Sequence, residues 1–203
     1  MFASVENRHH LEMLRKYGKS GYHVEYTALR KDVEGFIQMA FFDPGIKNTG
    51  FRIERRTDTS TWTVDMGIAD FSKNAPMDIL SFVKEHSRDL MDCHYILVES
   101  QLSKNRLAVE ISKHIISTII CLINSGACII EIDSKYKTDM IVGSKKRTKS
   151  DNLKAMSVVR ANEILLKNKD EKGLLMLNEL RKKDDVSDCV CYLEAWYEGL
   201  EFK

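Results

Sequence analysis

Residues 36–45 read FIQMAFFDPG, and this stretch decides the class of fold. Its first seven residues form a short apolar run, which is typical of a buried central strand. The run stops at Asp43, because the Pro44-Gly45 pair that follows favours a turn. The chain therefore places a strand inside a sheet, with a carboxylate directly at the end of that strand.

On the C-terminal side of this stretch, the chain alternates between predicted strands and predicted helices. The strands share short apolar runs bounded by turn residues, and they lie at residues 36–42, 50–54, 61–66, 95–98 and 127–132. The helices share apolar residues at helical spacing, and they cover residues 76–91, 105–124, 151–167 and 184–197. Five strands interleaved with helices in this order predict an α/β fold.

Composition is that of an ordinary globular protein, because 43% of the 203 residues are hydrophobic and 30% are charged. Residues 1–35 are polar and show no clear pattern, so we interpret them as an N-terminal arm of unknown role ahead of one domain over 36–203. The five cysteines form no CxxC pair, which argues against a disulfide framework or a zinc ribbon. The absence of an uncharged apolar run of about 18 residues predicts no membrane span, and we expect an intracellular protein.

Charge is unevenly distributed along the chain although the net charge is only +1. Residues 135–183 carry 14 Lys and Arg against 6 Asp and Glu. A basic segment beside acidic ones is typical of a polyanion-binding face next to a metal-binding carboxylate cluster. Solvated charged helices give the same composition, so both interpretations stay open at this point.

Four carboxylates lie where they can converge. Asp43 and Glu99 each follow a buried strand directly, and neighbouring strands of one sheet deliver such residues to a common edge. Asp185 and Asp188 are spaced i, i+3 on one face at the start of the final helix. Converging carboxylates repel one another unless a cation neutralises them, and oxygen ligands favour Mg²⁺ or Mn²⁺ over zinc. The alternatives are a turn aspartate and a helix cap.

Three short motifs resemble those of the RuvC-like Holliday-junction resolvases. These motifs are FDPG with NTG at 42–50, VESQ at 98–101 and KDDVSD at 183–188. The wording is nearest to the resolvases of poxviruses and other large DNA viruses, with fungal mitochondrial resolvases as further relatives. Viral members usually read Asp-Ile-Gly and Asn-Pro where this chain has Asp-Pro-Gly and Asn-Thr-Gly, which leaves the source open. The resemblance covers residues 36–198 and implies a ribonuclease H-like fold, with a five-stranded mixed sheet and helices on both faces.

The same resemblance implies roles for individual residues. Asp43, Glu99, Asp185 and Asp188 would be catalytic metal ligands for two Mg²⁺ ions per active site, with Mn²⁺ as a substitute. Asp184 would be a helix cap rather than a ligand. The segment from IVG at 141–143 to KS at 149–150 is similar to the one that carries the family's active-site lysine, which makes Lys149 the candidate. The nucleic-acid contacts expected from this basic loop are Lys145, Lys146, Arg147 and Lys149.

The function implied by the resemblance is DNA endonuclease activity on four-way junctions, by paired symmetric nicks, in DNA recombination or repair. We expect a homodimer built on the helix over 105–124, no membrane contact and no small-molecule cofactor. A viral source would place the protein in the host cytoplasm, and any other source in a mitochondrion or the nucleus. The competing hypotheses are a ribonuclease H acting on RNA–DNA hybrids, a transposase-like or exonuclease relative, a non-catalytic nucleic-acid-binding module and a scaffold that binds no nucleic acid.

Overall fold

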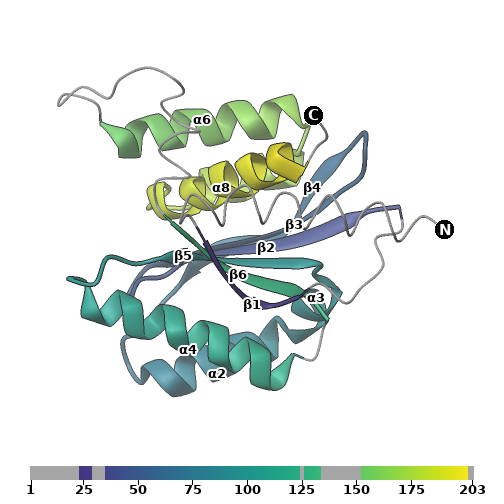
Figure 1. The fold of residues 1–203 in the computed structure, drawn as a ribbon. Helices are drawn as coiled ribbons and strands as arrows, with labels where there is room; N and C mark the ends of the chain where they lie inside the picture. Colours follow the sequence, from purple (N-terminus) through teal and green to yellow (C-terminus); the bar gives the residue numbers. More distant parts are fainter. Residues whose placement is uncertain (1–22, 29–34, 124–125, 134–151, 201–203) are drawn as a thin grey trace.

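A six-stranded mixed sheet forms the centre of the molecule (Figure 1). The computed structural model describes residues 23–28, 35–123, 126–133 and 152–200. In sheet order the strands are β1 (His23–Thr27), β6 (Cys128–Asp133), β5 (Tyr95–Ser100), β2 (Ile37–Asp43), β3 (Thr49–Arg56) and β4 (Thr61–Ala69). The β2–β5 and β5–β6 pairs are parallel and the other pairs are antiparallel. The predicted α/β fold with a mixed sheet is therefore confirmed.

The sheet has one strand more than the five predicted. The additional strand, β1, comes from the segment that we interpreted as an N-terminal arm, and it pairs antiparallel with β6. The Tyr26 hydroxyl donates to Glu131 Oε2 on β6 at 2.8 Å, and the Thr27 hydroxyl donates to the carbonyl of Ala127 at 2.8 Å. These contacts are made with a segment about 100 residues away along the chain, so the polar sequence of β1 did not reveal the strand by itself.

Helices cover both faces of the sheet, as predicted (Figure 1). One face carries α2 (Ala75–Glu85), α3 (Ser87–Asp92) and α4 (Arg106–Leu122), and the other carries α6 (Leu153–Lys167), α7 (Glu171–Glu179) and α8 (Asp184–Leu200). Strand β2 contributes to both cores: Ala40 and Phe42 pack in the cluster of α2 and α4, whereas Met39 and Phe41 pack in the cluster of α8. Both of its faces are buried, which explains why its sequence is apolar without alternation.

Two helical details differ from the sequence prediction. The helix predicted over 76–91 is two helices that meet at His86, whose Nε2 lies 3.1 Å from Asp65 Oδ2 on β4. Helix α7 was not predicted. Its N-cap residue Asp170 accepts a hydrogen bond from the backbone N–H of Gly173 at 3.0 Å and also contacts the Arg52 guanidinium on β3 at 2.9 Å. Both features depend on side chains from distant strands, which local periodicity does not report.

A buried ion network fixes α7 and α8 against β3. Arg52 pairs with Asp170 at 2.9 Å, Arg56 pairs with Glu194 on α8 at 2.7 Å, and Glu54 lies between the two arginines at 2.8 and 2.5 Å. All five side chains are at most 3% exposed. Burial raises the pKa of Glu194, but the charge of Arg56 and the hydrogen bonds from Arg56 and Asn168 outweigh burial and lower it. The contact with Arg56 therefore favours the ionised form of Glu194.

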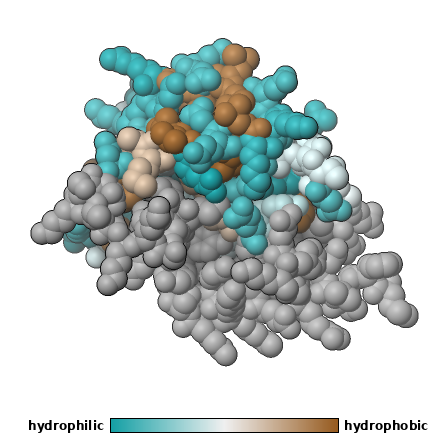
Figure 2. All heavy atoms as spheres, turned by 90° about the horizontal axis from the view of Figure 1, so that it is seen from above, coloured by the Kyte–Doolittle hydropathy of each residue, from teal (hydrophilic) through white to brown (hydrophobic). Residues whose placement is uncertain are grey.

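Apolar side chains also reach the surface over α6. Val159 and Leu166 lie seven residues apart on this helix and are 59% and 63% exposed. Figure 2 looks down onto this side of the molecule and shows hydrophobic side chains gathered among hydrophilic ones. None of the helices in the described part of the chain is long and apolar enough to cross a membrane.

Candidate carboxylate site

Two of the predicted acidic residues lie at the same edge of the sheet. Asp43 is the last residue of β2, and Glu99 is the next to last residue of β5. The parallel register of β2 and β5 pairs the residues directly before them, so the two carboxylates follow side by side. Strand alternation puts Asp43 on the side of Phe41 and Glu99 on the side of Leu97, and both of these apolar residues pack in the cluster of α8. Both carboxylates thus belong to the face that α8 covers.

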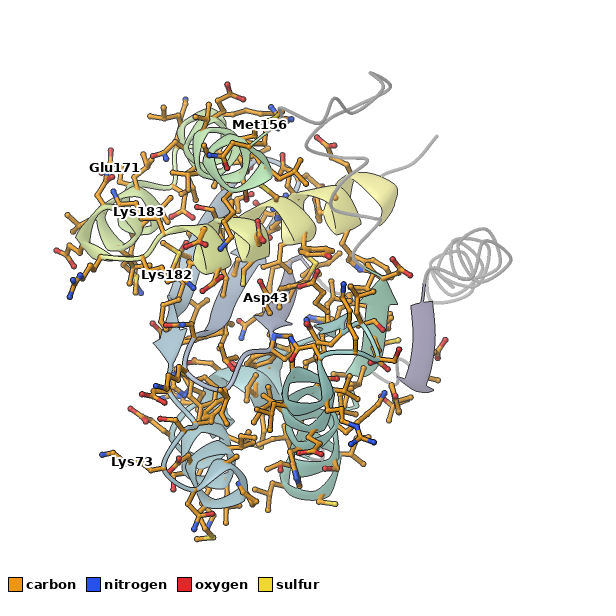
Figure 3. All side chains as sticks on the ribbon, turned by 90° about the vertical axis from the view of Figure 1, so that its left-hand side faces the viewer. Asp43, Lys73, Met156, Glu171, Lys182 and Lys183 are labelled. Carbon is orange, nitrogen blue, oxygen red and sulfur yellow. The ribbon has the colours of Figure 1, made fainter. Side chains whose placement is uncertain are left out.

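The first turn of α8 lies directly against this edge. Gly50 on β3 is the cross-strand partner of Asp43, and a Cβ atom at Gly50 would lie 2.6 Å from the carbonyl oxygen of Asp185 and 3.2 Å from its Cβ. The chain approaches so closely only because residue 50 has no side chain. Figure 3 shows Asp43 at the end of its strand, with Lys182 and Lys183 where the chain enters α8. The structure therefore brings Asp185 beside Asp43.

A buried tyrosine connects the remaining carboxylates. The Tyr192 hydroxyl on α8 donates to Glu99 Oε1 at 2.8 Å. Burial raises the pKa of Tyr192 well above its ordinary value, and the charges of Glu99, Asp43 and Asp188 add to this effect. Three predicted site residues therefore lie near one hydroxyl. The Ser157 hydroxyl on α6 donates to Asp188 Oδ1.

Two lysines face the acidic start of α8. Lys154 on α6 pairs with Asp184 at 2.5 Å, and Lys182 pairs with Asp185. The hydrogen bond to Asp184, aided by the charges of Asp184, Asp185 and Asp188, raises the pKa of Lys154 although burial opposes it. The same hydrogen bond and the lysine charges hold the pKa of Asp184 below its ordinary value against the effect of burial. Asp184 is the first residue of α8, and its carboxylate accepts a hydrogen bond from the Lys154 ammonium group.

Sequence reasoning missed Lys154 and Tyr192. Lys154 was detectable in principle, because a cation in the first turn of a helix opposes the helix dipole and indicates a carboxylate partner elsewhere. Tyr192 follows Asp188 by one helical turn, but only the tertiary structure shows that its hydroxyl reaches Glu99. The predicted nucleic-acid contacts Lys145, Lys146, Arg147 and Lys149 lie outside the described residues.

The donor chemistry of the site suits a hard divalent cation, since it consists of carboxylate oxygens. The side chains themselves, however, turn toward protein donors. Asp185 faces Lys182, Asp188 faces Ser157 and Glu99 faces Tyr192. Within the described ranges, no group of three or more His, Cys, Asp or Glu side chains is arranged to hold a metal ion. The backbone brings the carboxylates to one edge, whereas their side chains are in ion-paired and hydrogen-bonded positions.

Comparison with solved structures identifies the fold. The fowlpox virus Holliday junction resolvase superimposes with a TM-score of 0.58 at 18% identity, over 81% of this chain and 100% of that one. RuvC of T. thermophilus, solved with a Holliday junction substrate, gives a TM-score of 0.53 at 15% identity, over 81% of this chain and 96% of that one. The predicted ribonuclease H-like fold is therefore confirmed, and the resemblance to RuvC-like resolvases extends from the motifs to the three-dimensional structure.

Comparison of sequences finds a viral relative. The uncharacterized protein 170L of Invertebrate iridescent virus 6 is 23% identical over 137 residues, which are 58% of this chain. The match spans 56% of the length of that relative. No protein-family model matches the sequence.

Proposed function

We propose that this chain is a metal-dependent endonuclease that resolves four-way DNA junctions by paired symmetric nicks. The observation that carries the proposal is the meeting of Asp43, Glu99 and the acidic first turns of α8 at one edge of the sheet. The likeness of the fold to two Holliday junction resolvases supports the choice of substrate. A solvated surface without function would not need four carboxylates brought to one partly buried edge of the sheet, because like charges at such an edge repel one another.

The proposed ligands are Asp43, Glu99, Asp185 and Asp188. Two Mg²⁺ ions, or Mn²⁺ in their place, would supply a hydroxide nucleophile at neutral pH and stabilise the leaving oxygen. Asp43 ends the strand between β5, which carries Glu99, and β3, which α8 approaches closely at Gly50, so Asp43 would be the ligand shared between the ions. Lys182 and Lys154, which balance the carboxylates in this structure, would then be released toward the phosphates.

Substrate and assembly complete the proposal. The basic segment 135–183 would contact the phosphates around the branch point, with Lys145, Lys146 and Arg147 as binding residues and Lys149 near the reacting phosphate. A junction with twofold symmetry needs two symmetric nicks, so we propose a homodimer that matches that symmetry.

The decisive experiment is cleavage of a synthetic four-way junction by the full chain, with and without Mg²⁺, beside an RNA–DNA hybrid of equal length. We expect cleavage of the junction only, and only with Mg²⁺. Asp43→Asn removes a ligand and a charge that repels phosphate, so it should abolish cleavage while junction binding is kept or improved. Asp58→Asn, in the exposed turn between β3 and β4, is the matched control and should cut normally.

Three results would contradict the proposal. An Asp43→Asn protein that cuts the junction at the wild-type rate would refute the assignment of Asp43 and its neighbours as the active site. Preferential cleavage of the hybrid would indicate a ribonuclease H instead. Junction binding without cleavage in either Mg²⁺ or Mn²⁺ would indicate a non-catalytic binding module.

A further inference from the structure

Tyr192 joins three elements that build the carboxylate site. It is fully buried on α8, and its ring stacks on Phe41 of β2 with ring centroids 4.2 Å apart. Phe41 lies on the same side of β2 as Asp43, two residues before it. The Tyr192 hydroxyl in turn reaches Glu99 on β5. The position of this hydroxyl is therefore set by packing rather than by the carboxylate that it contacts.

Glu99 is a buried carboxylate that depends on such a donor. It is 6% exposed, and burying a carboxylate without hydrogen bonds is costly. The hydrogen bond from Tyr192 to Oε1 of Glu99 is 2.8 Å long, whereas the one from Gln101 Nε2 to Oε2 is 3.4 Å, near the upper limit. An ionised carboxylate offers about four acceptor positions, so Glu99 can keep the tyrosine and bind a cation at the same time.

We propose that Tyr192 is a positioning residue that orients Glu99 for metal binding. The inference rests on the proposed function, because it takes Glu99 as a ligand. A donor fixed by packing holds one oxygen of the carboxylate in place and thereby restricts the rotation of the whole group at this edge of the sheet. Hydrogen-bond partners of metal ligands typically change metal affinity about 10–100-fold when they are removed.

The test measures Mn²⁺ binding to the full chain without DNA, by electron paramagnetic resonance of the free ion. Tyr192→Phe keeps the ring that stacks on Phe41 and removes only the hydroxyl, and it should raise the Mn²⁺ dissociation constant about 10–100-fold. The matched control is Tyr26→Phe, which removes a hydroxyl that donates to Glu131 at the same distance of 2.8 Å. Glu131 contacts Lys113 and Ser112 of α4, on the opposite face of the sheet, so the control should bind Mn²⁺ like the wild type.

A second readout separates positioning from general damage to the fold. The Mg²⁺ concentration for half-maximal junction cleavage should rise in Tyr192→Phe, and saturating Mg²⁺ should restore most of the rate. A merely structural role would lower the rate at every Mg²⁺ concentration and would overturn the inference. Tyr192→Met, which puts a flexible apolar side chain without a donor in place of the ring, provides the comparison if the Phe variant does not fold.

The outcomes distinguish this inference from the proposed function. If Asp43→Asn loses Mn²⁺ binding while Tyr192→Phe and Tyr192→Met bind as the wild type does, Tyr192 has no positioning role and the metal site stands. If the wild type binds no Mn²⁺, the metal site and the inference both fall. If the Tyr192 variants bind Mn²⁺ more weakly than the wild type while Tyr26→Phe binds it normally, the inference is supported.

Discussion

Single residues at the acidic edge form two kinds of contact. Glu99 and Asp188 accept from neutral hydroxyls, whereas Asp184 and Asp185 face lysines. The contact from Tyr192 is buried and the one from Ser157 is partly buried, but the lysines are exposed at 72% for Lys154 and 42% for Lys182. Exposed ion pairs contribute little free energy and exchange readily. The lysine side of the site is thus the side on which cations and phosphates can replace protein partners.

Lys149 and its neighbours should differ in the kinetic quantity that they affect. Lys149→Ala should lower the turnover number about 100-fold with little loss of affinity, because it would remove a charge that we propose to act beside the reacting phosphate. Lys145→Ala should instead weaken junction binding and reduce the slope of log K against log salt by about 0.9. Single-turnover cleavage and binding titrations at several salt concentrations measure the two quantities. Equal small effects of both substitutions would mean that the segment is only a solvated loop.

At the scale of elements, the contact between α8 and β3 determines the geometry of the site. Gly50→Ala would place a methyl group 2.6 Å from the carbonyl oxygen of Asp185, so the first turn of α8 must move away from Asp43. A misplacement of about 1 Å at a reacting centre can cost about 100-fold in rate, and we expect a loss of that size in junction cleavage. Gly67→Ala is the control, since its methyl would meet only the Phe51 ring at 3.3 Å. Unchanged cleavage by Gly50→Ala would show that α8 does not position the site.

The ion network below α8 makes the stability of this contact depend on pH. Because the folded-state pKa of Glu194 lies below its ordinary value of 4.5, its contribution is fully present above pH 4.5 and is lost as pH falls through the folded-state pKa. Glu194→Gln removes one of the two carboxylates that pair with the buried Arg56, the other being Glu54, and should lower the free energy of unfolding at pH 7 by up to about 3 kcal/mol. Urea denaturation at pH 7 and below pH 4.5 measures the difference, which should shrink at the lower pH. Glu198 pairs with Lys167 at the surface, and its side chain is 44% exposed. Glu198→Gln should therefore have almost no effect on the free energy of unfolding at either pH.

The elements that the sequence predicted correctly are those whose pattern reports burial directly. The run 36–42 is apolar because both faces of β2 are covered, so its position was predictable without knowing its neighbours. Asp43 and Glu99 were predictable for the same reason, as they follow such runs. By contrast, β1, α7 and the break at His86 depend on partners far along the chain, and so does the Tyr192 contact. Pairings of this kind are fixed by tertiary packing rather than by local spacing.

At the scale of the whole molecule, the structure changes the argument for a dimer. In the sequence of the helix over 105–124, apolar residues at helical spacing form two stripes, and two stripes predict burial on both sides of the helix. One stripe holds Leu107, Ile111, Ile115 and Leu122, and the other holds Val109, Ile116, Ile120 and Ile123. Both stripes supply residues to one broad buried face of α4, because Ile111 and Ile115 pack in the same cluster as Ile116 and Ile123. A glutamate at Ile116, which is 3% exposed, would therefore damage the core rather than an interface. The interface must instead use apolar residues that remain at the surface.

Three such residues of α4 remain at the surface, at exposed fractions of 55%, 41% and 44%: Leu107, Ile120 and Leu122. We predict that Leu107→Glu/Ile120→Glu converts a dimer into a folded monomer, because burying the new charges in an interface is costly. The competing surface is α6, so Val159→Glu/Leu166→Glu is the matched control and should remain dimeric. Analytical ultracentrifugation at micromolar concentration measures the assembly state. Junction cleavage by the same variants shows whether making both nicks requires the dimer. A dimer that dissociates only in the α6 variant would move the interface to that helix, and a wild-type monomer that makes both nicks in one encounter would refute the twofold assembly.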